Sequence, residues 1–131
     1  MSEENVELVR ASIEAFNARD MDTVREMLDP AVVIARDLPG WPEPGPIAGR
    51  EAVMRSWQGI LDVFPEATVE LTSVTNVGDR VVARQVARGK GKGPEAIAEY
   101  TVISTLRNGR TLILEYFWDH AEALASLGLS E

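Results

Sequence analysis

Residues 100–118 read YTVISTL, RNGR and TLILEYFW, which are two apolar runs separated by a short polar segment. That segment contains Asn108-Gly109, the dipeptide most typical of a tight β-hairpin, because both central residues of such a turn need positive φ. The alternating β-branched and apolar residues on either side are typical of strands. We therefore predict two long antiparallel strands. A hairpin alone is marginally stable and needs further strands or a helical layer.

The rest of the chain is expected to supply both. Apolar residues at helical spacing predict a helix from Ser2 to Phe16, a short helix capped by Asp20 or Asp22, and a third helix from Arg50 to Phe64. A short continuous apolar run predicts a strand over 31–35, and alternating residues predict strands over 67–75 and 81–87. A short terminal helix is expected over 121–127. This order predicts one α+β domain over 1–131, with the helices on one concave face of a bent, mostly antiparallel sheet. A cone of this kind has a mouth and a cavity, the default place for a ligand.

Composition excludes several classes of protein. The 131 residues are 45% hydrophobic and carry a net charge of −8, which argues against a nucleic-acid partner. No apolar run reaches the length of a membrane span, and the acidic start, Met1 to Glu4, does not resemble a signal peptide. There is no cysteine and a single histidine, so no ordinary zinc site is expected. We expect a cytoplasmic protein that works without metal or organic cofactor.

A segment from Asp37 to Gly49 differs from the rest, because it holds four prolines and three glycines around Trp41. Such a segment cannot form a helix or a central strand. A long loop inside a small domain is more often functional than a linker. If this loop covers the cavity, apolar surroundings would raise the pKa of Asp37 and suit it as a general acid or base. As an alternative, Asp37 is a solvated loop residue that pairs with Arg36 or caps a turn.

Five short motifs resemble one family: AFNARD (15–20), GREAV (49–53), GDRVV (78–82), TLRNG (105–109) and WDHAEAL (118–124). In this order they are similar to the SnoaL-like polyketide cyclases of the nuclear-transport-factor-2-like superfamily. The resemblance implies a cone-shaped sheet around three helices, a pocket between them, and a homodimer through the sheet. Ketosteroid isomerases, epoxide hydrolases and non-enzymatic binding domains share this fold, so it does not define a reaction.

The resemblance also suggests roles for single residues. Asp37 falls near the catalytic aspartate of ketosteroid isomerases, whereas Ser12 and Val102 replace the two donors of that enzyme's oxyanion site. The epoxide hydrolases need an arginine and an aspartate two residues apart on a middle strand and an acid on the last strand. This sequence has Gln85, Ala87 and Tyr116 at these positions, so that chemistry is not expected. Asp119 is a candidate for the late acid of the polyketide cyclases. As an alternative, it caps the terminal helix, with Glu122 completing a capping box.

The remaining candidates are aromatic or polar side chains that could face the cavity. Tyr116 and Trp118 share one face of the last strand, and either that face or the opposite one could line the pocket. Small residues alternate with Gln85 along 81–87, which suggests open space beside that strand. We expect His120 to be exposed in the first turn of the terminal helix. The expected ligand-binding set is Phe16, Trp41, Trp57, Gln85, Tyr100, Tyr116 and Trp118.

Three functions remain open. The first is a cofactor-independent acid/base enzyme, either a cyclase, an isomerase or a dehydratase, in which Asp37 is the base and Gln85 and Tyr116 orient a carbonyl of a hydrophobic substrate. The second is a binding domain that holds a small hydrophobic molecule without chemistry. The third is a dimerising module whose sheet surface is its functional part.

Overall fold

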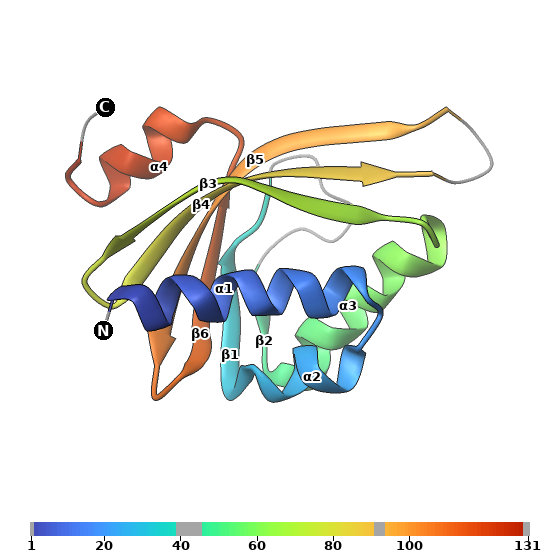
Figure 1. Cartoon of the computed structure of the whole chain (residues 1–131), viewed down its shortest axis with the longest axis horizontal. Helices are drawn as coiled ribbons and strands as arrows, with labels where there is room; N and C mark the ends of the chain where they lie inside the picture. The colour runs from blue at the N-terminus through green and yellow to red at the C-terminus, as the bar shows by residue number, and fades with distance from the viewer. Residues whose placement is uncertain (1, 39–45, 91–93, 130–131) are drawn as a thin grey trace.

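A computed structural model describes residues 2–38, 46–90 and 94–129. The elements follow one another as α1 (Ser2–Asn17), α2 (Met21–Glu26), β1 (Leu28–Arg36), β2 (Ile47–Ala48), α3 (Arg50–Val63), β3 (Thr68–Val77), β4 (Arg80–Gly89), β5 (Ala96–Arg107), β6 (Arg110–Phe117) and α4 (His120–Ser126). The strands form one curved sheet in the order β2-β1-β6-β5-β4-β3 (Figure 1). None of the described helices is long and apolar enough to cross a membrane.

The predicted hairpin is confirmed. Strands β5 and β6 pair antiparallel up to Arg107 opposite Arg110, and Asn108 and Gly109 have φ values of 52° and 75°. These are the positive values that a tight turn of this kind requires. The hairpin lies in the middle of the sheet, where β4 pairs antiparallel with β5 and β1 runs parallel to β6.

The region after α2 differs from the sequence prediction. The strand β1 begins at Leu28, three residues before the strand expected over 31–35, and it continues to Arg36. Pro30 lies where the pairing between β1 and β6 shifts register, and a residue without a backbone N–H is tolerated at such an irregularity. The segment expected to be a loop also contains the two-residue strand β2, which pairs with Val33 and Ile34 at the edge of the sheet.

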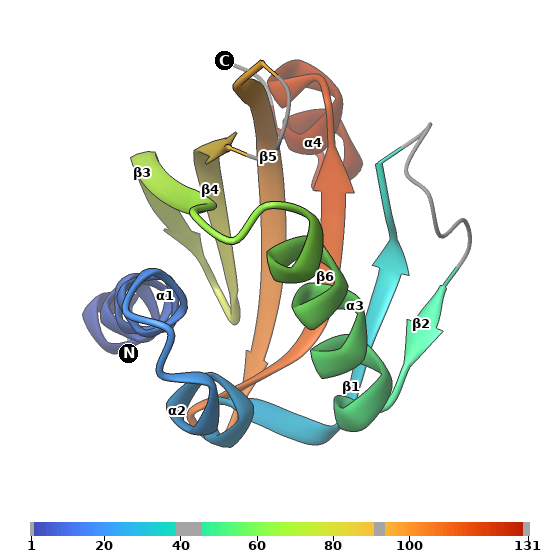
Figure 2. The ribbon, with the colours of Figure 1, turned by 90° about the vertical axis from the view of Figure 1, so that its right-hand side faces the viewer.

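The two faces of the sheet carry different helices. Helices α1, α2 and α3 surround the concave face, whereas α4 lies on the other side (Figure 2). Ala123 of α4 is fully buried in a cluster with Val82, Ile103 and Phe117. These strand residues alternate with those that face α1, such as Val81. The alternation of a strand therefore places two separate apolar layers on one sheet.

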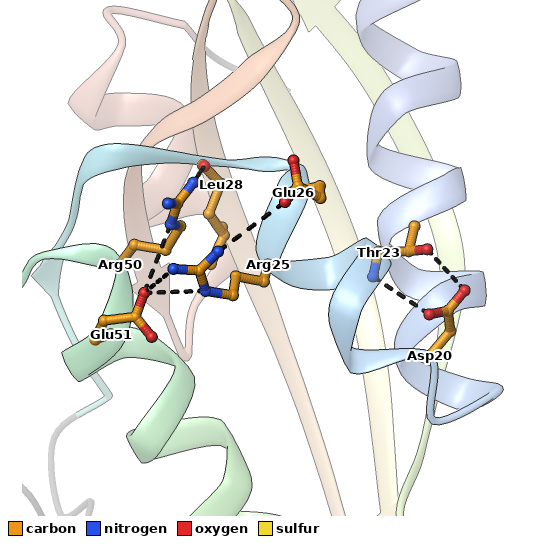
Figure 3. Close-up of polar contacts among 7 residues, drawn as sticks. All are labelled: Asp20, Thr23, Arg25, Glu26, Leu28, Arg50 and Glu51. Carbon is orange, nitrogen blue, oxygen red and sulfur yellow. Dashed lines mark hydrogen bonds and ion pairs between the residues drawn. The ribbon is translucent and has the colours of Figure 1, made fainter.

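Polar contacts join the short helix α2 to α3 (Figure 3). Arg25 donates from Nε to a carboxylate oxygen of Glu51 at 3.0 Å, and a second guanidinium nitrogen contacts the same oxygen. This contact lowers the pKa of Glu51 and raises the pKa of Arg25. Asp20 caps α2 by accepting a hydrogen bond from the backbone N–H of Thr23. The ion pair between Arg25 and Glu51 is exposed, so it contributes little to the stability of the fold.

Candidate functional site

The concave face of the sheet and helices α1, α2 and α3 enclose a cavity of about 190 Å³. Apolar cavities of roughly 150 Å³ hold molecules the size of benzene in other proteins, so this one has room for a ring system. Most of its lining is apolar. The polar residues among those that line it are Ser12, Asp37, Ser56, Trp57, Thr68, Gln85, Tyr100, Ser104, Thr111 and Tyr116.

Four of these polar residues form a row across the sheet. Gln85 of β4 lies opposite Tyr100 of β5, and the rings of Tyr100 and Tyr116 lie 5.8 Å apart at 46° to each other. Strand β1 pairs with β6, and its last residue, Arg36, lies opposite Glu115, the neighbour of Tyr116. Asp37 follows directly after Arg36. Residues far apart in sequence thus meet because their strands are neighbours and their side chains share one face.

The two tyrosines keep their protons over a wide pH range. Burial raises the pKa of Tyr100 to about 12. The pKa of Tyr116 is raised first by burial, then by Tyr100, then by the negative charge of Asp37. The indole N–H of Trp57 acts in the opposite direction, because it favours the ionised form of Tyr116. Both hydroxyl groups are therefore hydrogen-bond donors at neutral pH.

Asp37 is the single charged residue among the described lining residues. It is half-buried, and its Oδ1 accepts a hydrogen bond of 2.9 Å from the backbone N–H of Leu38. A carboxylate in a mostly apolar cavity favours a neutral or cationic ligand over an anionic one. Within the described part of the chain, no cluster of three or more His, Cys, Asp or Glu side chains could hold a metal ion.

The structure brings together most of the residues that the sequence singled out. Six line the same cavity: Phe16, Asp37, Trp57, Gln85, Tyr100 and Tyr116. Ala87 lines it too, whereas Val81 and Ala83, expected to border open space, are packed against Val9 of α1. Trp41 lies outside the described residues.

Two sequence predictions near the end of β6 need correction. The strand ends at Phe117, so Trp118 leaves the alternation that would have placed it beside Tyr116. The Trp118 side chain is 47% exposed and does not line the cavity. Asp119 does not line it either, because its carboxylate accepts a hydrogen bond from the backbone N–H of Ala121 and caps α4. Of its two predicted roles, the structure therefore supports the cap.

The surroundings of α4 also differ from expectation. His120 is half-buried, and its Nδ1 lies 3.0 Å from the hydroxyl of Thr101, a residue that is 1% exposed. Glu122 forms an ion pair with Arg36 at 2.6 Å, and no reciprocal bond to the backbone of the cap is found. These contacts attach α4 to the sheet face opposite the cavity.

Two buried serines of the lining, Ser56 and Ser104, were missed as binding residues. The strand alternation that places Tyr100 and Val102 on the concave face also includes Ser104, so the sequence held a signal for it. Ser56 lies on α3 at helical spacing from Val53 and Ile60, so the apolar side of that helix held a signal for it as well.

Comparison with known proteins agrees with this architecture. The model of the SnoaL-like domain matches residues 9–115. The chain belongs to this family. No curated protein matches it significantly.

Three similar solved structures cover nearly the whole chain. Bal32a, from a soil-derived mobile gene cassette, is 25% identical with a TM-score of 0.81, over 91% of this chain and 92% of that one. IdmH of Streptomyces antibioticus, described as a candidate polyketide cyclase, is 29% identical with a TM-score of 0.75, over 95% and 99% of the two chains. A protein of unknown function from Burkholderia pseudomallei is 25% identical with a TM-score of 0.77, over 95% and 97%.

Proposed function

We propose that this SnoaL-like protein is a cofactor-independent acid/base enzyme that acts on a neutral, hydrophobic carbonyl compound. The observation that carries the proposal is the row of polar groups in an otherwise apolar cavity. One end of the row is the Asp37 carboxylate, and the other groups, Tyr116, Tyr100 and Gln85, are donors at neutral pH. A base beside several donors is the arrangement that enolisation needs.

In the proposed reaction, Asp37 accepts a proton from the carbon next to the substrate carbonyl. The electron pair of the broken C–H bond moves into the carbonyl group, and the negative charge that develops on its oxygen is stabilised by the hydroxyl of Tyr116 and the amide of Gln85. Asp37 then returns the proton to another carbon, which completes an isomerisation. In a cyclisation, the enolate carbon instead attacks the carbon of a second carbonyl of the same substrate, whose π electrons move to its oxygen, and Asp37 gives its proton to that alkoxide. Removal of one such donor lowers turnover by about 10²–10³-fold in other enzymes.

The donors proposed here differ from those that the isomerase resemblance would require. The hydroxyl of Ser12 lies 2.9 Å from the carbonyl oxygen of Leu8 and 3.2 Å from the sulfur of Met27, so it is already engaged. Val102 is apolar and 2% exposed. In the proposed mechanism, Tyr116 of β6 and Gln85 of β4 take the place of that oxyanion site.

Hydrogen exchange of a simple ketone tests the proposal without knowledge of the substrate. The α-protons of 2-tetralone, a flat bicyclic ketone, are followed by NMR in deuterated buffer at neutral pH. The wild-type protein should accelerate their exchange, and Asp37→Asn should slow it at least a hundredfold. Asp119→Asn makes the same change of charge outside the cavity and should leave the rate unchanged. Equal rates for wild type and Asp37→Asn would remove Asp37 from the mechanism.

A binding domain without chemistry is the second candidate, and it is favoured because the Ser12 hydroxyl is already engaged and Val102 carries no donor. It is supported if the protein retains or binds small lipophilic molecules but accelerates no exchange. Native mass spectrometry of the purified protein and thermal shifts across a panel of lipophilic compounds measure this. No retained ligand and no shift would count against it.

The third candidate, a dimer formed through the sheet, concerns the face opposite the cavity. Ile97 is 55% exposed there, and the exposed Arg84, Arg88 and Glu99 lie on the same face of β4 and β5. An exposed apolar side chain surrounded by charges of both signs suits a self-complementary contact. Sedimentation at micromolar concentration tests it, and a monomer would refute it.

A further inference from the structure

Two residues at the end of α1, Asn17 and Arg19, attach that helix to the segment between α3 and β3. The side-chain amide of Asn17 donates to the carbonyl oxygen of Val69 and accepts from its backbone N–H, both at 2.8 Å. The amide thus pairs with β3 at the edge of the sheet, as a further strand would. Arg19 donates to the carbonyl oxygens of Pro65 at 2.8 Å and Ala67 at 2.6 Å. We call these contacts of Asn17 and Arg19 the α1 clamp; the segments that it joins lie at the same end of the molecule (Figure 1).

Arg19 is held in this position by its own turn of chain as well. Its φ value is 63°, in the left-handed region that residues other than glycine and asparagine seldom adopt. Its guanidinium also donates to the carbonyl oxygen of Phe16 at 3.0 Å, and its Cζ lies 5.5 Å from the centre of the Phe16 ring. A backbone of this kind persists only where the surrounding structure compensates for its cost. The side-chain contacts of Arg19 supply that compensation.

The α1 clamp fixes one wall of the cavity. The residues that it holds, Phe16, Ala67 and Val69, all line the cavity. Val69 lies opposite Ala87 of β4, and Ala87 lies opposite Ala98 of β5, so the sheet beside this wall carries small side chains that also line the cavity. The wall thus bounds a part of the cavity that the sheet itself leaves open.

This wall lies close to the proposed chemistry. Ala87 follows Gln85 by two residues on β4, which corresponds to roughly 7 Å along an extended strand. The small side chains of Ala87 and Ala98 leave room beside the row that contains Gln85. The apolar part of a ligand whose carbonyl lies at Gln85 can therefore extend over these alanines until it meets the wall.

We propose that Arg19, together with Asn17, limits the length of the ligand that the cavity accepts. Neither residue is among the described lining residues, so both act through the residues that they hold and are positioning residues. A ligand that reaches beyond the wall binds only if Phe16 and the connection from α3 to β3 move apart, which breaks the α1 clamp. This inference rests on the proposed function in that the ligand is a neutral, hydrophobic carbonyl compound held at Gln85, and it adds a determinant of specificity to that function.

A series of straight-chain ketones measures the length limit. The dissociation constants of the 2-alkanones from 2-pentanone to 2-undecanone are determined by isothermal titration calorimetry at neutral pH. In the wild-type protein, each added methylene should tighten binding by about fourfold until the chain meets the wall, after which longer ketones should gain nothing. In Arg19→Gly the gain should continue for at least two more methylenes. Glycine adopts the left-handed backbone of this position freely, so the variant removes the side-chain contacts without added strain.

Two further variants separate the α1 clamp from general effects on the fold. Asn17→Ala removes the other part of the clamp at an exposed position, and it should also shift the limit to longer ketones. It keeps the proposal testable if Arg19→Gly does not fold. Arg10→Ala is the matched control, because it removes an exposed arginine of α1 that pairs with Glu7, and it should leave the limit unchanged. A purely structural role of Arg19 would weaken the binding of short and long ketones by the same factor.

The outcomes distinguish this inference from the proposed function. A gain in affinity that continues to 2-undecanone in the wild type would overturn the inference, and so would one common limit in wild type, Arg19→Gly and Asn17→Ala. If no ketone of the series binds to the wild type, the inference is overturned as well. The exchange of 2-tetralone, measured on the same preparations, tests the proposed function separately. A limit that shifts in both variants of the clamp, without exchange in the wild type, would support the length limit and refute the acid/base reaction.

Discussion

The two tyrosines of the chain offer a direct optical test of the site. The sequence contains no tyrosine other than Tyr100 and Tyr116, and both line the cavity. Their pKa values are raised, that of Tyr100 to about 12. Raising the pH is therefore the perturbation, and tyrosinate absorbance reports on the cavity without a label. In the unfolded chain both groups should titrate near the ordinary value of about 10.

The size of the effect on stability follows from that difference. Tyr100 is half-buried, and a shift from about 10 to about 12 corresponds to about 3 kcal/mol. Because the folded state holds its proton more tightly, this contribution is complete below pH 10 and is lost between about pH 10 and 12. Roughly half of it is lost by pH 11. Tyr116 acts in the same direction. Domains of this kind have about 5–15 kcal/mol in total, so alkaline unfolding should accompany the ionisation.

The assay is a pH titration of absorbance at the tyrosinate band, with near-ultraviolet circular dichroism recorded in parallel. Native protein should show little tyrosinate at pH 10.5, and guanidinium-unfolded protein should show most of it. Asp37→Asn should lower the pKa of Tyr116 in the folded protein, because it removes a nearby negative charge, whereas Asp119→Asn should not. Native protein that titrates near pH 10 with its dichroism intact would refute the burial of both tyrosines and the cavity reasoning.

Further predictions concern the fold and the terminal helix. Gly89→Ala should cost about 1–3 kcal/mol in the free energy of unfolding, because its Cβ would lie 2.8 Å from Cγ of Phe64. Gly59→Ala is the matched control: nothing lies within 4 Å of its Cβ, and a better helix former there should stabilise the protein by about 0.5–1 kcal/mol in urea titrations. A destabilised Gly59→Ala would contradict this picture of α3. Asp119→Ala should lower stability by about 1 kcal/mol through loss of the cap of α4 and should leave the exchange of 2-tetralone unchanged. A loss of exchange activity in this variant with unchanged stability would restore Asp119 as a catalytic residue.

Local sequence patterns predicted an element well where interactions between neighbouring residues alone decide its structure. The turn at Asn108 and Gly109 depends on backbone conformation alone, and its positive φ values confirm it. Helices α1 and α3 and strands β3 to β6 follow from periodicity, with ends that differ by a few residues. Strand β2 was missed, because two residues carry no periodic signal and pair only when β1 offers an edge.

The site could be predicted in part. Asp37, Gln85 and Tyr116 were proposed as a set, and they lie in one row of the cavity. The choice between the two faces of β6 stayed open in the sequence, since alternation gives two faces but not which one is covered. Trp118 was wrongly placed because the strand ends one residue before it, and this end depends on the cap of α4.

The sequence by itself therefore determined the order of the elements, the central hairpin, the fold family and the residue types available for chemistry. These follow from conformational preferences of neighbouring residues, which act without the rest of the chain. Only the tertiary structure decided which side chains share the cavity and which charges they feel. The row from Gln85 to Asp37 exists because β4, β5, β6 and β1 are neighbours in the sheet, although they are not consecutive in the chain.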